Sequence, residues 1–121
     1  MYIKKGVREA VYNRYDKHCA YCGNKLDNIK DMQIDHIIPI RYHGTNDISN
    51  LNPSCRSCNH YKRASDLEQF REIMITLHER IRNNYINKVA ERYGIITVKP
   101  FSGYFYFEVL KLNAVYEIMI K

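Results

Sequence analysis

A chain of 121 residues fits one domain, or one small module with an extension. The formal net charge is +6, so nucleic acid is the obvious class of partner, although many solvated domains are equally basic. No stretch approaches the roughly 18 apolar residues of a membrane span. The start, Met1-Tyr2-Ile3-Lys4-Lys5, leads directly into a polar helix pattern and contains no apolar segment typical of a secretory signal. We therefore expect a cytoplasmic protein without a membrane partner.

The first part of the chain predicts a short helix, a turn and a strand. Residues 6–17 place their apolar side chains on one face of a helix. Gly23 suits the turn that follows, because glycine tolerates backbone angles that other residues avoid. Residues 24–31 are polar and indicate a loop. Residues 32–38 alternate and then become fully apolar, which predicts a strand that Pro39 ends.

A second strand and a helix should complete this core. Residues 43–47 have the composition of a turn, and Leu51 begins the return of the chain. The residues after Cys55 should open a helix that continues to about Ser65. The predicted core order is therefore strand, loop, strand, helix.

A longer helix is expected next, with Asp66 as its N-cap. The pair Asn83-Asn84 interrupts the pattern with weak helix formers, so a break there is plausible. Gly94 is a natural residue to follow the helix end. The apolar stripe of this helix is Leu67, Phe70, Met74, Leu77, Ile81, Tyr85, Val89 and Tyr93.

The remaining residues predict a C-terminal β-hairpin. Residues 95–98 and 104–110 flank Pro100 and a Ser-Gly turn, and tyrosines alternate along the second segment. The fold class we expect is α+β. Its core would occupy residues 1–66, and residues 67–121 would form a helix and hairpin extension packed on that core as one compact domain.

Four cysteines form two Cys-x-x-Cys pairs, Cys19/Cys22 and Cys55/Cys58. In a chain without a secretory signal, such pairs are more typical of a metal site than of disulfides. The loop between the pairs is longer than the roughly 15–20 residues of a simple zinc ribbon, so something folded should fill it. We expect structural Zn²⁺, which four protein ligands would leave without an open position for catalysis.

Several short motifs between and beyond the cysteine pairs resemble those of one nuclease family. Over roughly residues 14–71, the chain resembles the HNH endonucleases, in the branch of the ββα-metal nucleases that carries a four-cysteine zinc. Residues 66–71 and 105–108 look like small free-standing HNH proteins of phages. The motifs that carry the resemblance are Cys-x-x-Cys-Gly, Asp35-His36-Ile37-Ile38-Pro39, Gly44-Thr45-Asn46-Asp47-Ile48-Ser49-Asn50-Leu51, Cys55-Arg56-Ser57-Cys58-Asn59 and Lys62.

The resemblance implies a role for each matching residue. Asp35 would be the anionic ligand of a catalytic Mg²⁺ or Mn²⁺, and Asn59 would be the second protein ligand. His36 would be the general base that takes a proton from the attacking water. Asn50 would brace the loop and orient His36, and Lys62 would contact phosphate.

Three features complicate these roles. His60 directly follows Asn59 and competes with it for the role of metal ligand. Successive residues on a helix are turned by about 100°, so the two side chains should not reach the same ion, and we prefer Asn59. His43 lies in the loop over the site, where it could contact the scissile strand or remain solvated. Asp35 and His36 are adjacent, and adjacent strand residues point to opposite faces, so we expect a strong twist or a strand end there.

DNA should be bound mainly through its phosphates, because no helix groups Arg, Asn and Gln for reading the major groove. We therefore expect weak sequence preference. The basic residues proposed for this contact are Lys62, Arg63, Arg56, Arg8 and Arg14.

The function that the resemblance implies is a metal-dependent DNA endonuclease that leaves 5′-phosphate and 3′-hydroxyl ends. Two alternatives remain open: a site-specific restriction or homing enzyme of the same type, and a zinc-knuckle DNA-binding module without activity. The small size favours a phage-type nuclease in a bacterial or phage-infected cell. A homodimer, or a phage packaging or host protein, could supply what the short chain lacks.

Overall fold

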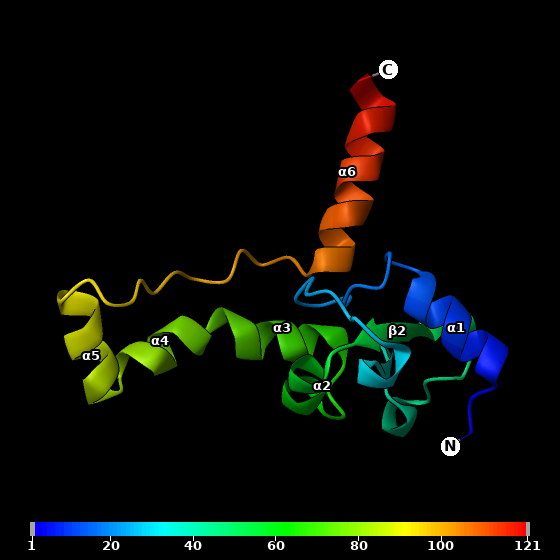
Figure 1. Ribbon diagram of the computed structural model, residues 1–121, viewed down its shortest axis with the longest axis horizontal. Coiled ribbons are helices and arrows are strands. Elements are labelled where there is room, and N and C mark those ends of the chain that lie inside the picture. The colour runs from blue at the N-terminus through cyan, green and yellow to red at the C-terminus, as the bar shows by residue number, and fades with distance from the viewer. Residues whose placement is uncertain (1, 121) are drawn as a thin grey trace. The chain divides into compact units, whose positions relative to one another are not determined.

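The computed structural model describes residues 2–120 and has the expected α+β class (Figure 1). The contacts divide the chain into two units. The first takes the residues up to Leu67 together with those from Phe105 onward, and the second is Glu68–Tyr104. The predicted division at residue 66 stays a prediction. The residues from Phe105 onward, however, group with the first unit and not with Glu68–Tyr104.

The first helix, α1 (Lys5–Asn13), supplies one side of the hydrophobic core. Its inward face buries Val11 and Tyr12, and the Tyr12 hydroxyl donates a hydrogen bond of 2.6 Å to the carbonyl of Leu26. The core cluster consists of Val11, Tyr12, Leu26, Met32 and Leu51. This core cluster is small, so we expect the fold to need stabilising interactions other than apolar packing.

A two-stranded antiparallel sheet lies against this core. Strand β1 (Gln33–His36) pairs with β2 (Leu51–Ser54), and the register places Asp35 opposite Asn52. Strand β1 is shorter than predicted and ends at His36, which confirms the expected strand end at this point. Three single turns of 3₁₀ helix flank the strands, at Ile29–Asp31, Ile40–Tyr42 and Ile48–Asn50.

Helix α2 (Arg56–Lys62) completes the predicted order of strand, loop, strand and helix. Cys55 is its N-cap, and the Cys55 sulfur accepts a hydrogen bond from the backbone N–H of Cys58. The helix ends before the predicted Ser65, because Arg63 has a positive φ of 52° that an α-helix does not accommodate.

The predicted C-terminal hairpin is wrong, because residues 106–120 form a helix, α6 (Tyr106–Ile120). The carboxylate of Glu108 accepts a hydrogen bond of 2.9 Å from the backbone N–H of Phe105, which is the backward half of a capping box. This contact starts a helix where the alternating tyrosines had suggested a strand. Among residues 2–120, no helix is long and apolar enough to cross a membrane.

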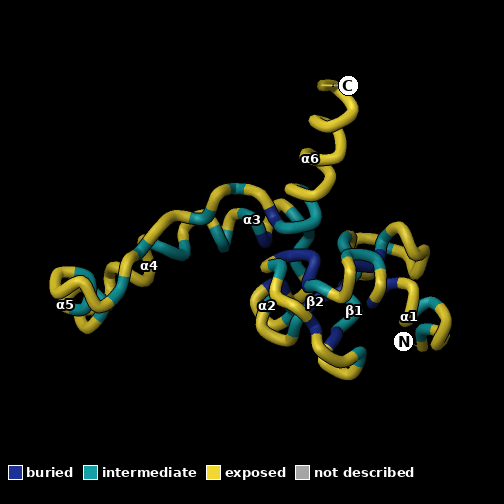
Figure 2. Tube along the Cα trace, turned by 45° about the horizontal axis from the view of Figure 1, so that its top comes forward, coloured by how far each residue is buried: buried dark blue, intermediate teal, exposed yellow. Residues whose placement is uncertain are grey.

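The first turn of α6 is fixed to the first cysteine pair. The backbone N–H groups of Tyr106 and Phe107 donate to the carbonyls of Tyr21 and Ala20, at 3.1 and 2.8 Å. A side chain at Gly23, which has a φ of 78°, would approach the Tyr106 ring to 2.7 Å. Glycine is therefore needed there for both its backbone angle and the close contact. Beyond this first turn the helix is exposed (Figure 2).

The second unit contains three short helices in place of the single long one predicted: α3 (Leu67–Ile75), α4 (Leu77–Arg82) and α5 (Tyr85–Arg92). The break at Asn83-Asn84 is confirmed, and the Asn84 side chain caps α5. The additional break falls at Thr76, whose hydroxyl bonds to the carbonyls of the preceding turn and competes with the helix. Gly94 follows α5 with a φ of 73°, as expected.

Candidate nuclease and metal site

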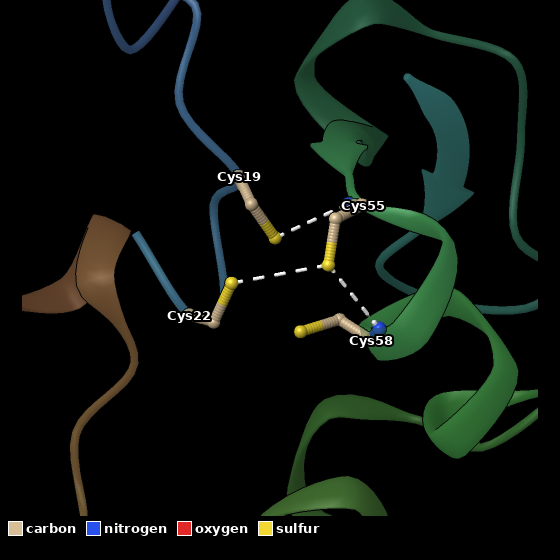
Figure 3. Close-up of side chains that lie close together, drawn as sticks. All are labelled: Cys19, Cys22, Cys55 and Cys58. Carbon is tan, nitrogen blue, oxygen red and sulfur yellow. Dashed lines mark hydrogen bonds between the residues drawn. The ribbon is translucent and has the colours of Figure 1, made fainter. Parts of the chain in front are cut away.

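The four cysteines converge from two separate parts of the chain (Figure 3). Their sulfur atoms all lie within 4.8 Å of one another, and the Sγ atoms of Cys22 and Cys55 are 3.8 Å apart. Metal–sulfur bonds of about 2.3 Å in a tetrahedron would place the sulfurs about 3.8 Å apart. The cluster therefore has the dimensions of a four-thiolate metal site.

Backbone and thiol hydrogen bonds favour negative charge on one member of this cluster, Cys19. The backbone N–H of Cys55 donates to the Cys19 sulfur at 3.3 Å. Hydrogen bonds from the thiols of Cys22 and Cys58 hold the pKa of Cys19 far below its ordinary value. A buried thiolate among neighbouring thiols is the environment that a metal cation would complete.

A cleft of about 260 Å³ brings together three of the residues predicted for catalysis. Asp35 and His36 reach it from the end of β1, and Asn59 reaches it from α2. Arg41 and Arg63 line it as well. The cleft thus combines a carboxylate, an imidazole, an amide and two permanent cations.

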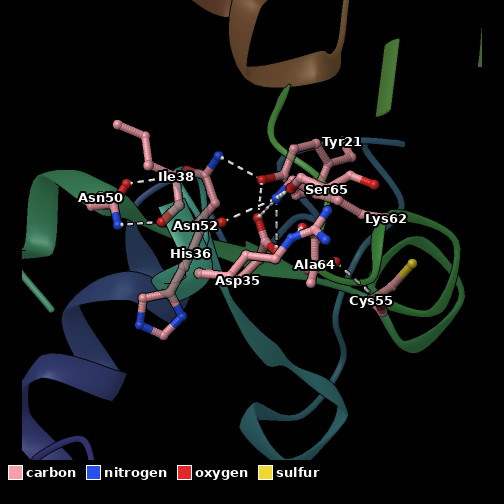
Figure 4. A network of polar contacts seen from close by, with 12 residues as sticks. Tyr21, Asp35, His36, Ile38, Asn50, Asn52, Cys55, Lys62, Ala64 and Ser65 are labelled. Atoms are coloured by element: carbon pink, nitrogen blue, oxygen red, sulfur yellow. Dashed lines mark hydrogen bonds and ion pairs between the residues drawn. The ribbon is translucent and has the colours of Figure 1, made fainter. Parts of the chain in front are cut away.

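Asp35 is buried in a polar network (Figure 4). The Tyr21 hydroxyl donates to its Oδ2 atom, and the Lys62 ammonium lies 3.2 Å from Oδ1 and 3.1 Å from Oδ2. Burial raises the pKa of the Asp35 carboxyl, and the Tyr21 hydrogen bond and the Lys62 charge only partly offset that rise. Burial sets the direction here because desolvation of a carboxylate is costly even beside a cation.

Lys62 does not lie where a phosphate contact would require it. Its side chain is fully buried, and its ammonium also donates to the carbonyls of His36 and Ser65, at 3.0 and 2.8 Å. The expected phosphate contact is therefore corrected to an internal one. Lys62 ties the end of α2 to the end of β1, and so fixes the backbone of His36.

His36 projects away from this network, as Figure 4 shows. Its Nε2 atom lies 2.8 Å from the amide oxygen of Asn46. Asn50, predicted to orient the ring, instead bonds to both backbone groups of Ile38 and to the carbonyl of Thr45. Asn50 thus braces the loop after β1, and Asn46 is the side chain in contact with the imidazole.

The structure distinguishes between the two residues that compete on α2. Asn59 lines the cleft, whereas His60 is exposed and its ring packs edge-on against Tyr61 with the centroids 6.2 Å apart. His43 lines a neighbouring pocket with Asn50 and does not reach the cleft. The residue positions therefore favour Asn59 over His60 as the partner of Asp35.

The basic residues proposed for phosphate contact are dispersed over the first unit. Arg63 lines the cleft, and Arg56 lines another cavity beside the cysteines. Arg14 is half-buried and donates to the carbonyls of Leu51 and Ile48. Arg8 on α1 is also half-buried. Arg41, which the sequence reasoning missed, lines the cleft with its Nε bonded to the carbonyl of Ala64 at 2.7 Å.

Tyr21 is the most consequential residue that the sequence reasoning missed. Its ring is packed edge-on between Phe105 and Phe107, with centroid distances of 5.4 and 5.8 Å, and its hydroxyl contacts Asp35. Tyr21 therefore connects the cysteine cluster, the C-terminal segment and the carboxylate of the cleft. Its place between two cysteines gave no signal of that role.

We expect Tyr21→Phe to lower the free energy of unfolding by about 1–3 kcal/mol, because it removes one of the two partners of Oδ2 of the buried Asp35 carboxylate and leaves only Lys62 there. The ring packing would be kept. Urea denaturation measures the change. Tyr61→Phe is the matched control at an exposed tyrosine, where the change should stay within about 0.5 kcal/mol. Equal stability of the two variants would show that the Tyr21 hydroxyl does not support Asp35.

Comparison with known families places a single domain on this region. Residues 19–65 match a family model described as HNH endonuclease. The match begins at the first cysteine of the cluster and contains both strands and α2. It confirms the resemblance that the motifs had indicated. A search of curated proteins gives no match.

Proposed function

Since residues 19–65 are an HNH endonuclease domain, we propose that the chain is a metal-dependent endonuclease that hydrolyses the phosphodiester bonds of DNA. The observation that carries this proposal is the single cleft lined by Asp35, His36 and Asn59. A protein that only bound DNA would have no use for a base and two oxygen ligands at one place. Hydrolysis requires them together.

His36 is the general base in this proposal. An amide oxygen only accepts hydrogen bonds, so the contact with Asn46 holds a proton on Nε2 of the neutral ring. Nδ1 is then the nitrogen left to accept a proton from the attacking water. A histidine is suited to this task because its ordinary pKa, about 6.5, lies close to working pH.

Asp35 and Asn59 would hold a catalytic Mg²⁺ or Mn²⁺. Their carboxylate and amide oxygens are the hard donors that these ions prefer, and both residues line one cleft. A carboxylate can accept about four hydrogen bonds or metal contacts, so the contacts with Tyr21 and Lys62 leave capacity for an ion. Such an ion would stabilise the negative charge that builds up on the phosphoryl group and the leaving oxygen.

The cysteine cluster would hold Zn²⁺ in a structural role. Its four thiols fill a tetrahedral shell, and the cluster is located at the N-terminus of α2, which carries Asn59 and Lys62. Zinc would in this way fix the helix that carries one side of the cleft.

The DNA would be held mainly by its phosphates, with Arg41 and Arg63 at the cleft as the nearest permanent cations. A site-specific restriction or homing enzyme remains the alternative within this enzyme class. Sequencing the ends of a cleaved long random DNA distinguishes the two, because a site-specific enzyme leaves recurrent ends. A homodimer, a phage packaging or host partner, and a cytoplasmic location stay predictions.

Nicking of a supercoiled plasmid tests the proposal. The folded protein should nick with Mg²⁺ or Mn²⁺ and stop when EDTA is added at the start of the reaction. Asp35→Asn should lower the rate by about 10²-fold or more, since the charge stabilisation by a metal is worth several kcal/mol. Asp16→Asn, at an exposed aspartate, is the control for charge. Binding without nicking under either metal would favour a DNA-binding module without activity.

A further inference from the structure

A second cavity, of about 510 Å³, adjoins the cleft but shares none of its lining residues. Two of its residues are next to the proposed catalytic ones. Ile37 follows His36 in the chain, and Asn52 pairs with Asp35 in the sheet. Material bound in this cavity would therefore lie next to the site of hydrolysis.

Asn52 forms part of the wall of this cavity. Its side chain is fully buried, and Nδ2 donates to the Tyr21 hydroxyl at 3.4 Å. Its Oδ1 atom is buried and has no hydrogen-bond partner among the described residues. Asn52 is therefore a fixed part of the wall, and its own side-chain contact is the one to Tyr21.

The walls of the cavity are partly aromatic and apolar, which suits the binding of a flat heterocyclic ring. Tyr15 and Phe107 face it with their rings 6.2 Å apart between centroids and inclined by 39°. Ile37 and Leu110 add apolar surface. Aromatic side chains of this kind stack on nucleobases with little regard to which base is present.

Positive charge completes the lining. The guanidinium of Arg14 is held in place by hydrogen bonds to the carbonyls of Leu51 and Ile48, at 2.5 and 2.7 Å. Lys111 on α6 is the second cation, and it is exposed. None of the described residues that line the cavity is acidic, so an anion would meet no repulsion from its walls.

We propose that this cavity binds one nucleotide of the nucleic-acid substrate, an inference that rests on the proposed function. The base lies against Tyr15 and Phe107, beside the part of the wall that Asn52 forms. Its phosphate lies between Arg14 and Lys111. A paired base cannot enter such a pocket, so the nucleotide is either single-stranded or turned out of the duplex.

Titration of the ¹⁵N-labelled full chain with each of the four deoxynucleoside 5′-monophosphates tests this site. The side-chain NH₂ signals of Asn52 should shift and saturate with a Kd between about 10 µM and about 1 mM, the range expected for a ligand of this size. Inorganic phosphate at the same concentrations should leave these signals in place. Equal shifts with phosphate alone would reduce the cavity to an anion site and overturn the proposal. No shift at Asn52 with any nucleotide would also overturn it.

The variant Lys111→Gln tests the contribution of the phosphate to binding separately from that of the base. It should weaken nucleotide binding about two- to fivefold, the scale of an exposed ion pair, and leave binding of the uncharged deoxynucleoside unchanged. Lys99→Gln makes the same change of charge at an exposed lysine that does not line the cavity, and should have no effect. Equal losses in both variants would contradict the site.

The binding readout does not depend on cleavage. A chain that nicks DNA but shows no shift at Asn52 keeps the proposed function and loses this inference. A chain that binds nucleotides at Asn52 but does not nick DNA keeps this inference and loses the proposed function.

Discussion

Replacing His36 with alanine is expected to slow DNA nicking by about 10²–10⁴-fold, the usual contribution of a general base. Fold, bound metal and DNA affinity should stay unchanged, for a structural reason. The imidazole is only half-buried, and it forms a hydrogen bond to an exposed loop residue, Asn46. Its removal therefore opens no cavity in the core and leaves the hydrogen bonds that Tyr21 and Lys62 donate to Asp35 in place. Initial rates of plasmid nicking measure the loss, and filter binding measures the affinity.

His43→Ala is the matched control, because His43 is exposed and lies in the same loop region outside the cleft. We expect it to keep wild-type nicking within a few-fold. If the His36→Ala variant cleaved at the wild-type rate, the general base would have to be another residue. If both variants lost activity equally, the loop as a whole would be the sensitive element, and His36 would have no special role in proton transfer.

The core was predictable because its signals are local. The two Cys-x-x-Cys pairs indicate which two segments of the chain come together in space. Pro39 and Gly23 indicate turns through the backbone angles that these residue types adopt. The order of strand, loop, strand and helix followed from these marks together with the apolar pattern of residues 32–38. The preference for Asn59 over His60 came from the resemblance, and a turn of about 100° per residue on a helix explains why only Asn59 of the two lines the cleft.

The C-terminal segment was not predictable by the same means. Alternating tyrosines suit a strand, but Glu108 caps the backbone N–H of Phe105, and two further N–H groups find carbonyls on the first cysteine pair. Those partners lie more than eighty positions earlier in the chain, so no window of sequence contains both. Tertiary contacts here override local propensity.

Lys62 illustrates a second limit. A lysine in a basic chain is most often solvated, and its charge suggests a phosphate. Its burial depends on the simultaneous presence of Asp35 and two carbonyl acceptors, which come from two different elements. Charge alone cannot tell an internal ion pair from an external contact, because the pairing exists only in the folded chain.

Cys58→Ser is expected to give unfolded or insoluble protein and to abolish bound zinc, which should be near one ion per chain in the wild type. Structural zinc contributes about 10–16 kcal/mol of apparent binding energy in small domains, whereas whole domains are stable by only about 5–15 kcal/mol. The apolar core of this chain is small, so it has little reserve to compensate for the loss. The cluster also begins α2, where the Cys55 sulfur accepts the N–H of Cys58.

Ser57→Ala is the control for this prediction, since Ser57 is exposed and adjacent to Cys58 at the start of the same helix. It should keep the circular dichroism spectrum, the solubility and the zinc content of the wild type, as measured by atomic absorption. Because α2 carries both Asn59 and Lys62, loss of the metal should release the contacts of Lys62 with β1 and displace Asn59, and the cleft should disappear together with the fold. A soluble and fully folded Cys58→Ser variant without bound metal would show instead that packing of the apolar core and the aromatic contacts of Tyr21 hold the fold without zinc.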